Sequence, residues 1–204
     1  MYYKHDKSPA IIRKKMVYTI CVKVRCQFMW NAIYSFVWLF ILFKWGNLKN
    51  WSKYYPTYLF FLLGDFIYLY FLSDIYPMWK YTPQGIDKEI GLVNAHVSLS
   101  IMLIKYPATT AVYLSKFPDK GKMKKVLYIT FWVLIYFVNE LIDTKTHLIS
   151  YYHGWSIYWS ILFNFVMFTI LRIHYRKPLA AWIFSVAVIL FLWFKFDVPY
   201  KVFR

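Results

Sequence analysis

The chain has 204 residues, of which 60% are apolar and only 17% are charged, a composition too apolar for a single water-soluble domain. The apolar residues gather into blocks long enough to cross a bilayer, unlike the 3.6-residue stripes of a soluble helical core. The 25 Lys and Arg residues against 9 Asp and Glu give a net charge of +16. In a soluble protein this charge would suggest a nucleic-acid partner, but no nucleic-acid-binding motif accompanies the bases. Because they lie mostly between the apolar blocks, anionic lipid headgroups are the expected partner instead.

The predicted fold class is all-α, an integral membrane bundle of about six transmembrane helices. Lipid cannot satisfy backbone polar groups, and the period-two alternation of a membrane barrel does not occur in the sequence. Residues 1–25 are expected to form a basic interfacial segment, and residues 26–204 a single transmembrane helical domain. The expected spans, in chain order, are 26–43, 57–73, 90–114, 126–142, 155–171 and 179–196. Pro107 predicts a kink in the third span, because proline removes a backbone donor.

The charges of the connecting loops predict an orientation. The connections 44–56, 116–125 and 172–178 hold eleven bases and the single acid Asp119, whereas 74–89 and 143–154 hold four acids and three bases. The tendency of basic loops to stay inside the cell therefore places the 116–125 loop in the cytoplasm. Seven bases in the first 25 residues oppose this assignment, so the two orientations are nearly balanced.

Ionisable side chains inside the predicted spans each cost about 2.5–3.5 kcal/mol, and therefore indicate a partner or a function. Asp65 lies in the middle of the second span, and Lys105 lies just past the middle of the third. Opposite charges at similar depth on consecutive helices predict an ion pair, for which a structural role is favoured over proton or ion transfer. Asn94 and Ser98 share a helical face with Lys105 and are predicted to form a polar seam.

A second polar group is predicted at one mouth of the bundle. Glu140, Asp143 and His147 follow one another at helical spacing, and His153 and His96 lie near the same ends of neighbouring spans. Carboxylate oxygens and imidazole nitrogens at one depth could bind a divalent metal, or relay protons. In the plainer interpretation the carboxylates mark the headgroup boundary and His147 lies in a solvated loop, since no named metal-binding spacing is present.

The stretch from Glu140 to Pro178 resembles a known family. The residues that carry the likeness are Leu148-Ile149-Ser150-Tyr151-Tyr152-His153-Gly154-Trp155, Tyr158-Trp159-Ser160 and Arg172-Ile173-His174-Tyr175-Arg176. They resemble a family of small, uncharacterised, multi-pass membrane proteins of spore-forming Gram-positive bacteria, which the earlier spans match mainly in hydropathy. The resemblance implies an integral protein of the bacterial plasma membrane and implies no activity. The amino-terminal tail is longer than the starts typical of that family.

Three functional hypotheses follow from these features. The favoured one is a protein that acts by binding, either to another membrane protein subunit or to lipid. It needs no reaction chemistry, and the sequence has no Gly-rich phosphate loop and no nucleophile elbow, so enzyme activity is not favoured. The first alternative is a small transporter or channel subunit with a polar path through Asp65, Lys105 and Glu140, although no inverted repeat is evident. The second alternative is an intramembrane metal-dependent enzyme built on the mouth group of carboxylates and histidines.

Overall fold

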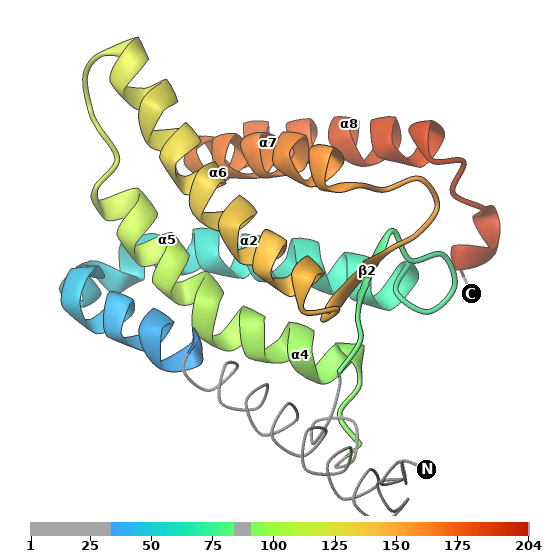
Figure 1. The fold of residues 1–204 in the computed structure, drawn as a ribbon. Coiled ribbons are helices and arrows are strands. Elements are labelled where there is room, and N and C mark those ends of the chain that lie inside the picture. Colours follow the sequence, from blue (N-terminus) through green and yellow to red (C-terminus); the bar gives the residue numbers. More distant parts are fainter. Residues whose placement is uncertain (1–33, 84–90, 204) are drawn as a thin grey trace, which may run out of the picture.

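The computed structural model describes residues 34–83 and 91–203, which form a helical bundle with a small β-ribbon at one end (Figure 1). The elements, in chain order, are a helix Tyr34–Trp45, η1 Leu48–Asn50, α2 Trp51–Phe71, β1 Trp79–Tyr81, α4 Asn94–Ser100, the π-helical turn η2 Ile101–Lys105, α5 Tyr106–Ser115, α6 Lys122–Lys145, β2 Ile149–Tyr151, α7 Ile157–Arg176, α8 Pro178–Lys195 and η3 Tyr200–Val202.

Four of the described helices are long and apolar enough to cross a membrane. They are the continuous run Asn94–Ser115, which contains α4, η2 and α5, followed by α6, α7 and α8. These four correspond to the third to sixth predicted spans.

The first two predicted spans differ from these four. The span predicted over 57–73 is α2, which starts earlier and is less apolar because several tyrosines and Asp65 interrupt it. The span predicted over 26–43 lies partly outside the described residues, and its described part is the shorter helix Tyr34–Trp45. The predicted interfacial segment 1–25 lies wholly outside them.

The third span is interrupted by η2, which ends two residues before Pro107. A proline ring crowds the carbonyl group four residues earlier, here that of Leu103, and the wider π turn relieves the crowding. The irregularity expected at Pro107 thus takes the form of a π turn in the preceding residues. Lys105 is buried at the end of this turn, and Tyr106 reaches a carboxylate on α2.

The described structure is helical as expected, and the short β-ribbon is an addition that was not predicted. Its two strands are antiparallel, with Trp79 opposite Tyr151 and Tyr81 opposite Ile149. They join the two connections 74–89 and 143–154, which were expected to be loops. Three-residue strands are too short to show a period-two pattern, and their pairing is long-range, so hydropathy could not reveal them.

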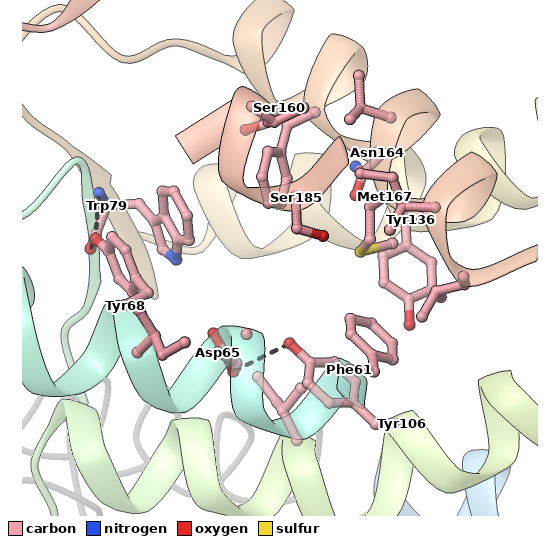
Figure 2. Close-up of a pocket in the computed structure, with 18 of the residues that line it drawn as sticks. Phe61, Asp65, Tyr68, Trp79, Tyr106, Tyr136, Ser160, Asn164, Met167 and Ser185 are labelled. Atoms are coloured by element: carbon pink, nitrogen blue, oxygen red, sulfur yellow. Dashed lines mark hydrogen bonds between the residues drawn. The ribbon is translucent and has the colours of Figure 1, made fainter. Parts of the chain in front are cut away.

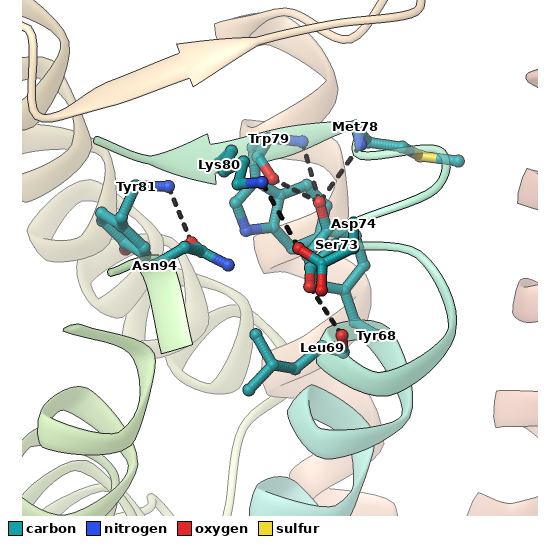
Figure 3. Close-up of polar contacts among 9 residues, drawn as sticks. All are labelled: Tyr68, Leu69, Ser73, Asp74, Met78, Trp79, Lys80, Tyr81 and Asn94. Carbon is teal, nitrogen blue, oxygen red and sulfur yellow. Dashed lines mark hydrogen bonds and ion pairs between the residues drawn. The ribbon is translucent and has the colours of Figure 1, made fainter. Parts of the chain in front are cut away.

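Side chains of two helices hold the ribbon in place (Figure 3). The Tyr68 hydroxyl of α2 accepts hydrogen bonds from the backbone N–H groups of Met78 and Trp79, at 3.1 and 2.9 Å, and donates one to the Trp79 carbonyl. The Tyr68 ring also stacks on the Trp79 indole, with ring centroids 3.9 Å apart. At the start of α4, Asn94 Oδ1 accepts a hydrogen bond of 2.8 Å from the Tyr81 N–H. The ribbon is therefore fixed to both α2 and α4.

The core lies where α5, α6 and α7 meet, and it is aromatic. Phe168 and Tyr113 have no exposed surface, and Trp132 packs against both rings. The Tyr113 hydroxyl donates a hydrogen bond of 2.8 Å to the backbone carbonyl of Phe168. Burial of these large rings, with the Tyr113 hydroxyl satisfied, joins the three helices through their side chains.

The basic connections meet at the end of the bundle opposite the ribbon (Figure 1). The Arg172 guanidinium lies 4.2 Å from the Phe117 ring centroid, and Arg176 pairs with Asp119 at 3.7 Å. These contacts join the 116–125 and 172–178 connections. Bases from two connections are thus gathered at this end of the described structure.

Tyr68→Phe tests the attachment of the ribbon. The change leaves two backbone N–H groups and one carbonyl without their partner, which is expected to cost about 1–3 kcal/mol of unfolding free energy. Tyr70→Phe is the matched control, because Tyr70 lies on the same helix with 79% of its surface exposed. Chemical unfolding of the detergent-solubilised proteins, followed by circular dichroism, measures the difference. Equal stability of the two variants would contradict this role for Tyr68.

Candidate functional site

A cavity of about 260 Å³ lies inside the bundle between α2, the η2–α5 junction, α6, α7 and α8, and the β-ribbon contributes to its wall (Figure 2). Most of the wall is aromatic or aliphatic. The lining nevertheless includes Asp65, Lys105, Glu140 and Asp143. The sequence suggested one group of Asp65 and Lys105 and a second group that contains Glu140 and Asp143. In the structure both groups line the same cavity.

Asp65 and Lys105 face this cavity without forming the direct ion pair predicted from the sequence. Among the described residues, no ion pair joins Lys105 to a carboxylate. Asp65 Oδ2 instead accepts a hydrogen bond of 3.0 Å from the Tyr106 hydroxyl. Lys105 and Tyr106 are adjacent in sequence, but their side chains contact different helices. Tyr106 reaches Asp65 on α2, whereas Lys105 lies against Tyr136 on α6.

The ammonium group of Lys105 lies among aromatic rings. The side chain is only 8% exposed, and its Nζ is 4.0 Å from the centroid of the Tyr136 ring. The rings of Trp38 and Tyr34 lie 5.7 and 5.8 Å away. A desolvated ammonium over a ring face gains about 2 kcal/mol or more, which offsets part of the cost of burying the charge.

Glu140 and Asp143 lie on the last turns of α6, which continues to Lys145. Glu140 Oε1 accepts a hydrogen bond of 2.7 Å from the Tyr151 hydroxyl of β2. Burial, together with the neighbouring Glu140 carboxylate, raises the pKa of Tyr151 above its ordinary value, so the phenol remains a donor at physiological pH. The ribbon therefore positions one of the carboxylates that line the cavity.

The predicted metal group does not assemble. Across residues 34–83 and 91–203, no three His, Cys, Asp or Glu side chains are arranged to hold a metal ion. The shared face of Glu140, Asp143 and His147 required a continuous helix, but α6 ends at Lys145 and His147 has a φ of 58°. That left-handed conformation turns the chain away from the helix axis.

The two other candidate histidines serve local structure. His153 Nδ1 lies 2.8 Å from the carbonyl oxygen of Pro77, on an exposed part of the 152–156 connection. His96 Nδ1 accepts a hydrogen bond of 3.2 Å from the Val93 N–H at the start of α4. Neither histidine lines the cavity.

Three polar residues of the cavity were not anticipated from the sequence (Figure 2). Asn164 of α7 is only 7% exposed, its side chain points into the cavity, and it hydrogen-bonds to none of the described residues. One turn earlier, Ser160 Oγ accepts a hydrogen bond of 2.9 Å from Trp155 Nε1, so its own hydroxyl hydrogen can be donated. Ser185 of α8 contributes another hydroxyl. The four-residue spacing of Ser160 and Asn164 within an apolar span was the signal that could have revealed them.

The cavity reaches the gap between α2 and α8, which we assign as its opening. Gly64, Trp182 and Ile189 line the cavity at this gap and are exposed. A Cβ atom added to Gly64 would meet no atom within 4 Å. Glycine in a helix interior costs about 0.5–1 kcal/mol relative to alanine, and no close neighbour requires a glycine at this position. The residue keeps the opening clear.

Comparison with protein-family models, with curated proteins and with solved structures found no match to the chain. The function is therefore inferred from the cavity and from the surface around it.

Substitutions at Lys105 separate its charge from its packing. In Lys105→Met the side chain keeps its contact with Tyr136 and loses the cost of a desolvated charge, so we expect an unchanged or higher unfolding midpoint. Lys105→Glu adds a fourth carboxylate to the cavity and is expected to lower stability by about 3 kcal/mol or more. Thermal unfolding of the purified proteins, followed by tryptophan fluorescence, measures both effects. Failure of Lys105→Met to fold would show that the ammonium group itself is structural.

Proposed function

We propose that this chain is a multi-pass protein of the bacterial plasma membrane that binds a small molecule in the cavity of its helical bundle. The observation that carries the proposal is Asn164, a buried amide that points into the cavity and hydrogen-bonds to none of the described residues. Buried polar groups are normally hydrogen-bonded, and a pocket with a few convergent polar groups is the usual form of a ligand site. The proposal narrows the binding hypothesis from protein subunits and lipid to a molecule that fits inside the bundle.

The outer surface supports the membrane location. Among the residues of α8 only Ala181 is buried, while large apolar side chains such as Leu179, Ile183 and Phe194 are more than two-thirds exposed. On α6, Leu127 is likewise 60% exposed. A helix that is apolar all round is typical of a membrane span, and apolar patches of this extent are rare on soluble monomers. The basic end of the bundle suits anionic headgroups, and the resemblance over 140–178 favours a bacterial plasma membrane.

Transport is a second candidate, favoured by one observation. Asp65, Lys105 and Glu140, the residues of the predicted polar path, all line the same cavity. A binding site of this kind inside a bundle is also where a transporter holds its substrate. The binding step is common to both candidates, and it is the step tested below.

Gly64 offers a direct test of binding. Gly64→Trp fills the open side of the cavity, whereas Gly64→Ala leaves it open and is expected to stabilise α2 by up to about 1 kcal/mol. Native mass spectrometry of protein released from membranes should detect a bound small molecule in the wild type and in Gly64→Ala, and none in Gly64→Trp. Identical spectra for all three proteins would contradict the proposal.

Cysteine labelling tests the proposed orientation, in which the 116–125 loop is cytoplasmic. The background carries Cys21→Ser and Cys26→Ser, which removes both native cysteines. A membrane-impermeant maleimide added to intact cells should label Tyr152→Cys at the ribbon end. It should label Asp119→Cys only after permeabilisation, because the basic connections stay inside. The reverse pattern would invert the orientation, and labelling of both sites in intact cells would contradict the membrane-spanning arrangement.

A further inference from the structure

The charges around the cavity are opposite in sign to those of the rest of the chain. Within the described residues, three of the six Asp and Glu residues line it, namely Asp65, Glu140 and Asp143, but only one of the sixteen Lys and Arg residues, Lys105. A net positive protein thus places an excess of negative charge inside its bundle. In a poorly solvated space such an excess favours a positively charged occupant.

We propose that the occupant is an organic cation, a primary amine in its ammonium form with a small apolar body. This inference rests on the proposed function, because it names the class of molecule that the cavity binds. The two kinds of lining group have different roles, since the carboxylates neutralise the charge and the apolar wall contacts the rest of the molecule.

Aromatic rings supply the second half of this chemistry. The indole rings of Trp79 and Trp155 line the cavity with their centroids 5.1 Å apart, and Phe61 and Tyr106 line it from the other side. Ring faces attract ammonium groups, most strongly where water is excluded. The chain already uses this interaction at the cavity edge, where the ammonium of Lys105 lies over the Tyr136 ring.

Asn164 and Ser185 distinguish an organic amine from a metal ion. Their side chains face the cavity, and neither hydrogen-bonds to a described residue. The amide oxygen and the hydroxyl can accept hydrogen bonds from an ammonium group while a nearby carboxylate balances its charge. A divalent metal would need a closer set of ligands, and no such set exists in the described part of the chain. A volume of about 260 Å³ with a largely apolar wall instead suits a molecule with a hydrocarbon body.

The position of the opening agrees with this class of ligand. Gly64 and Ile189 lie at the opening, beside outer surfaces of α2 and α8 that are apolar. In the proposed membrane arrangement the opening faces lipid. An amine with an apolar body partitions into the bilayer interface, and could therefore enter from the side.

Binding of 2-phenylethylammonium tests the inference. The full-length protein in lipid nanodiscs is titrated by calorimetry with this cation, with its uncharged carbon isostere propylbenzene, and with the anion phenylacetate; empty nanodiscs correct for partitioning. We expect binding of the cation alone. Asp65→Asn should weaken it by about tenfold or more, because the amide keeps the hydrogen bond from Tyr106 and removes only the charge.

Asp74→Asn is the matched control, since Asp74 is an exposed carboxylate outside the cavity, and it should bind as the wild type does. Thermal unfolding of each variant shows whether it is folded. Equal binding of the isostere, stronger binding of phenylacetate, or no effect of Asp65→Asn would overturn the cationic class and leave small-molecule binding intact. If none of the three probes binds and Gly64→Trp matches the wild type in mass spectrometry, the proposed function itself fails.

Discussion

The burial of Lys105 is the constraint around which the rest of the bundle is organised. A desolvated ammonium costs several kcal/mol unless something compensates it, and in this chain no carboxylate contacts it among the described residues. The compensation comes from Tyr136, Trp38 and the longer-range field of three carboxylates across a cavity. Because the charges are separated, the space between them stays open. A contact ion pair would have closed it.

The β-ribbon explains how that space is kept open. Through Tyr68 it is fixed to α2, through Asn94 to α4, and through Tyr151 to the Glu140 carboxylate on α6. Three helices that carry polar or ionisable residues are thus held together by this short two-stranded ribbon. Backbone groups of the ribbon pair across the two strands or with the Tyr68 and Asn94 side chains, as buried backbone groups require. The ribbon is therefore part of the site as well as of the fold.

Hydropathy predicted four of the described helices well, because a span of about 20 apolar residues depends on local composition and very little on contacts with other helices. The cost of burying charge singled out Asp65 and Lys105, and helical spacing singled out Glu140 and Asp143; all four residues line the cavity. The rest depended on long-range contacts. The pairing of β1 with β2 joins segments far apart in the chain, and the histidine sites depended on where α6 ends. Gly64 carries no side chain to mark it, so its role depends on the space beside it.

The wall formed by α8 differs from the other walls of the cavity. It supplies Trp182, Ser185 and Ile189 to the lining, yet only Ala181 of the whole helix is buried. Among the described elements its one extensive partner is α7, whereas Phe168 and Tyr113 join α5 and α7 without any contribution from α8. Widening the gap between α2 and α8 would therefore disturb few close contacts, chiefly that between the rings of Phe60 and Trp182. The rigid walls carry the carboxylates and the ammonium, and the loosely packed wall borders the opening. This division lets a ligand enter without displacing the groups that would bind it.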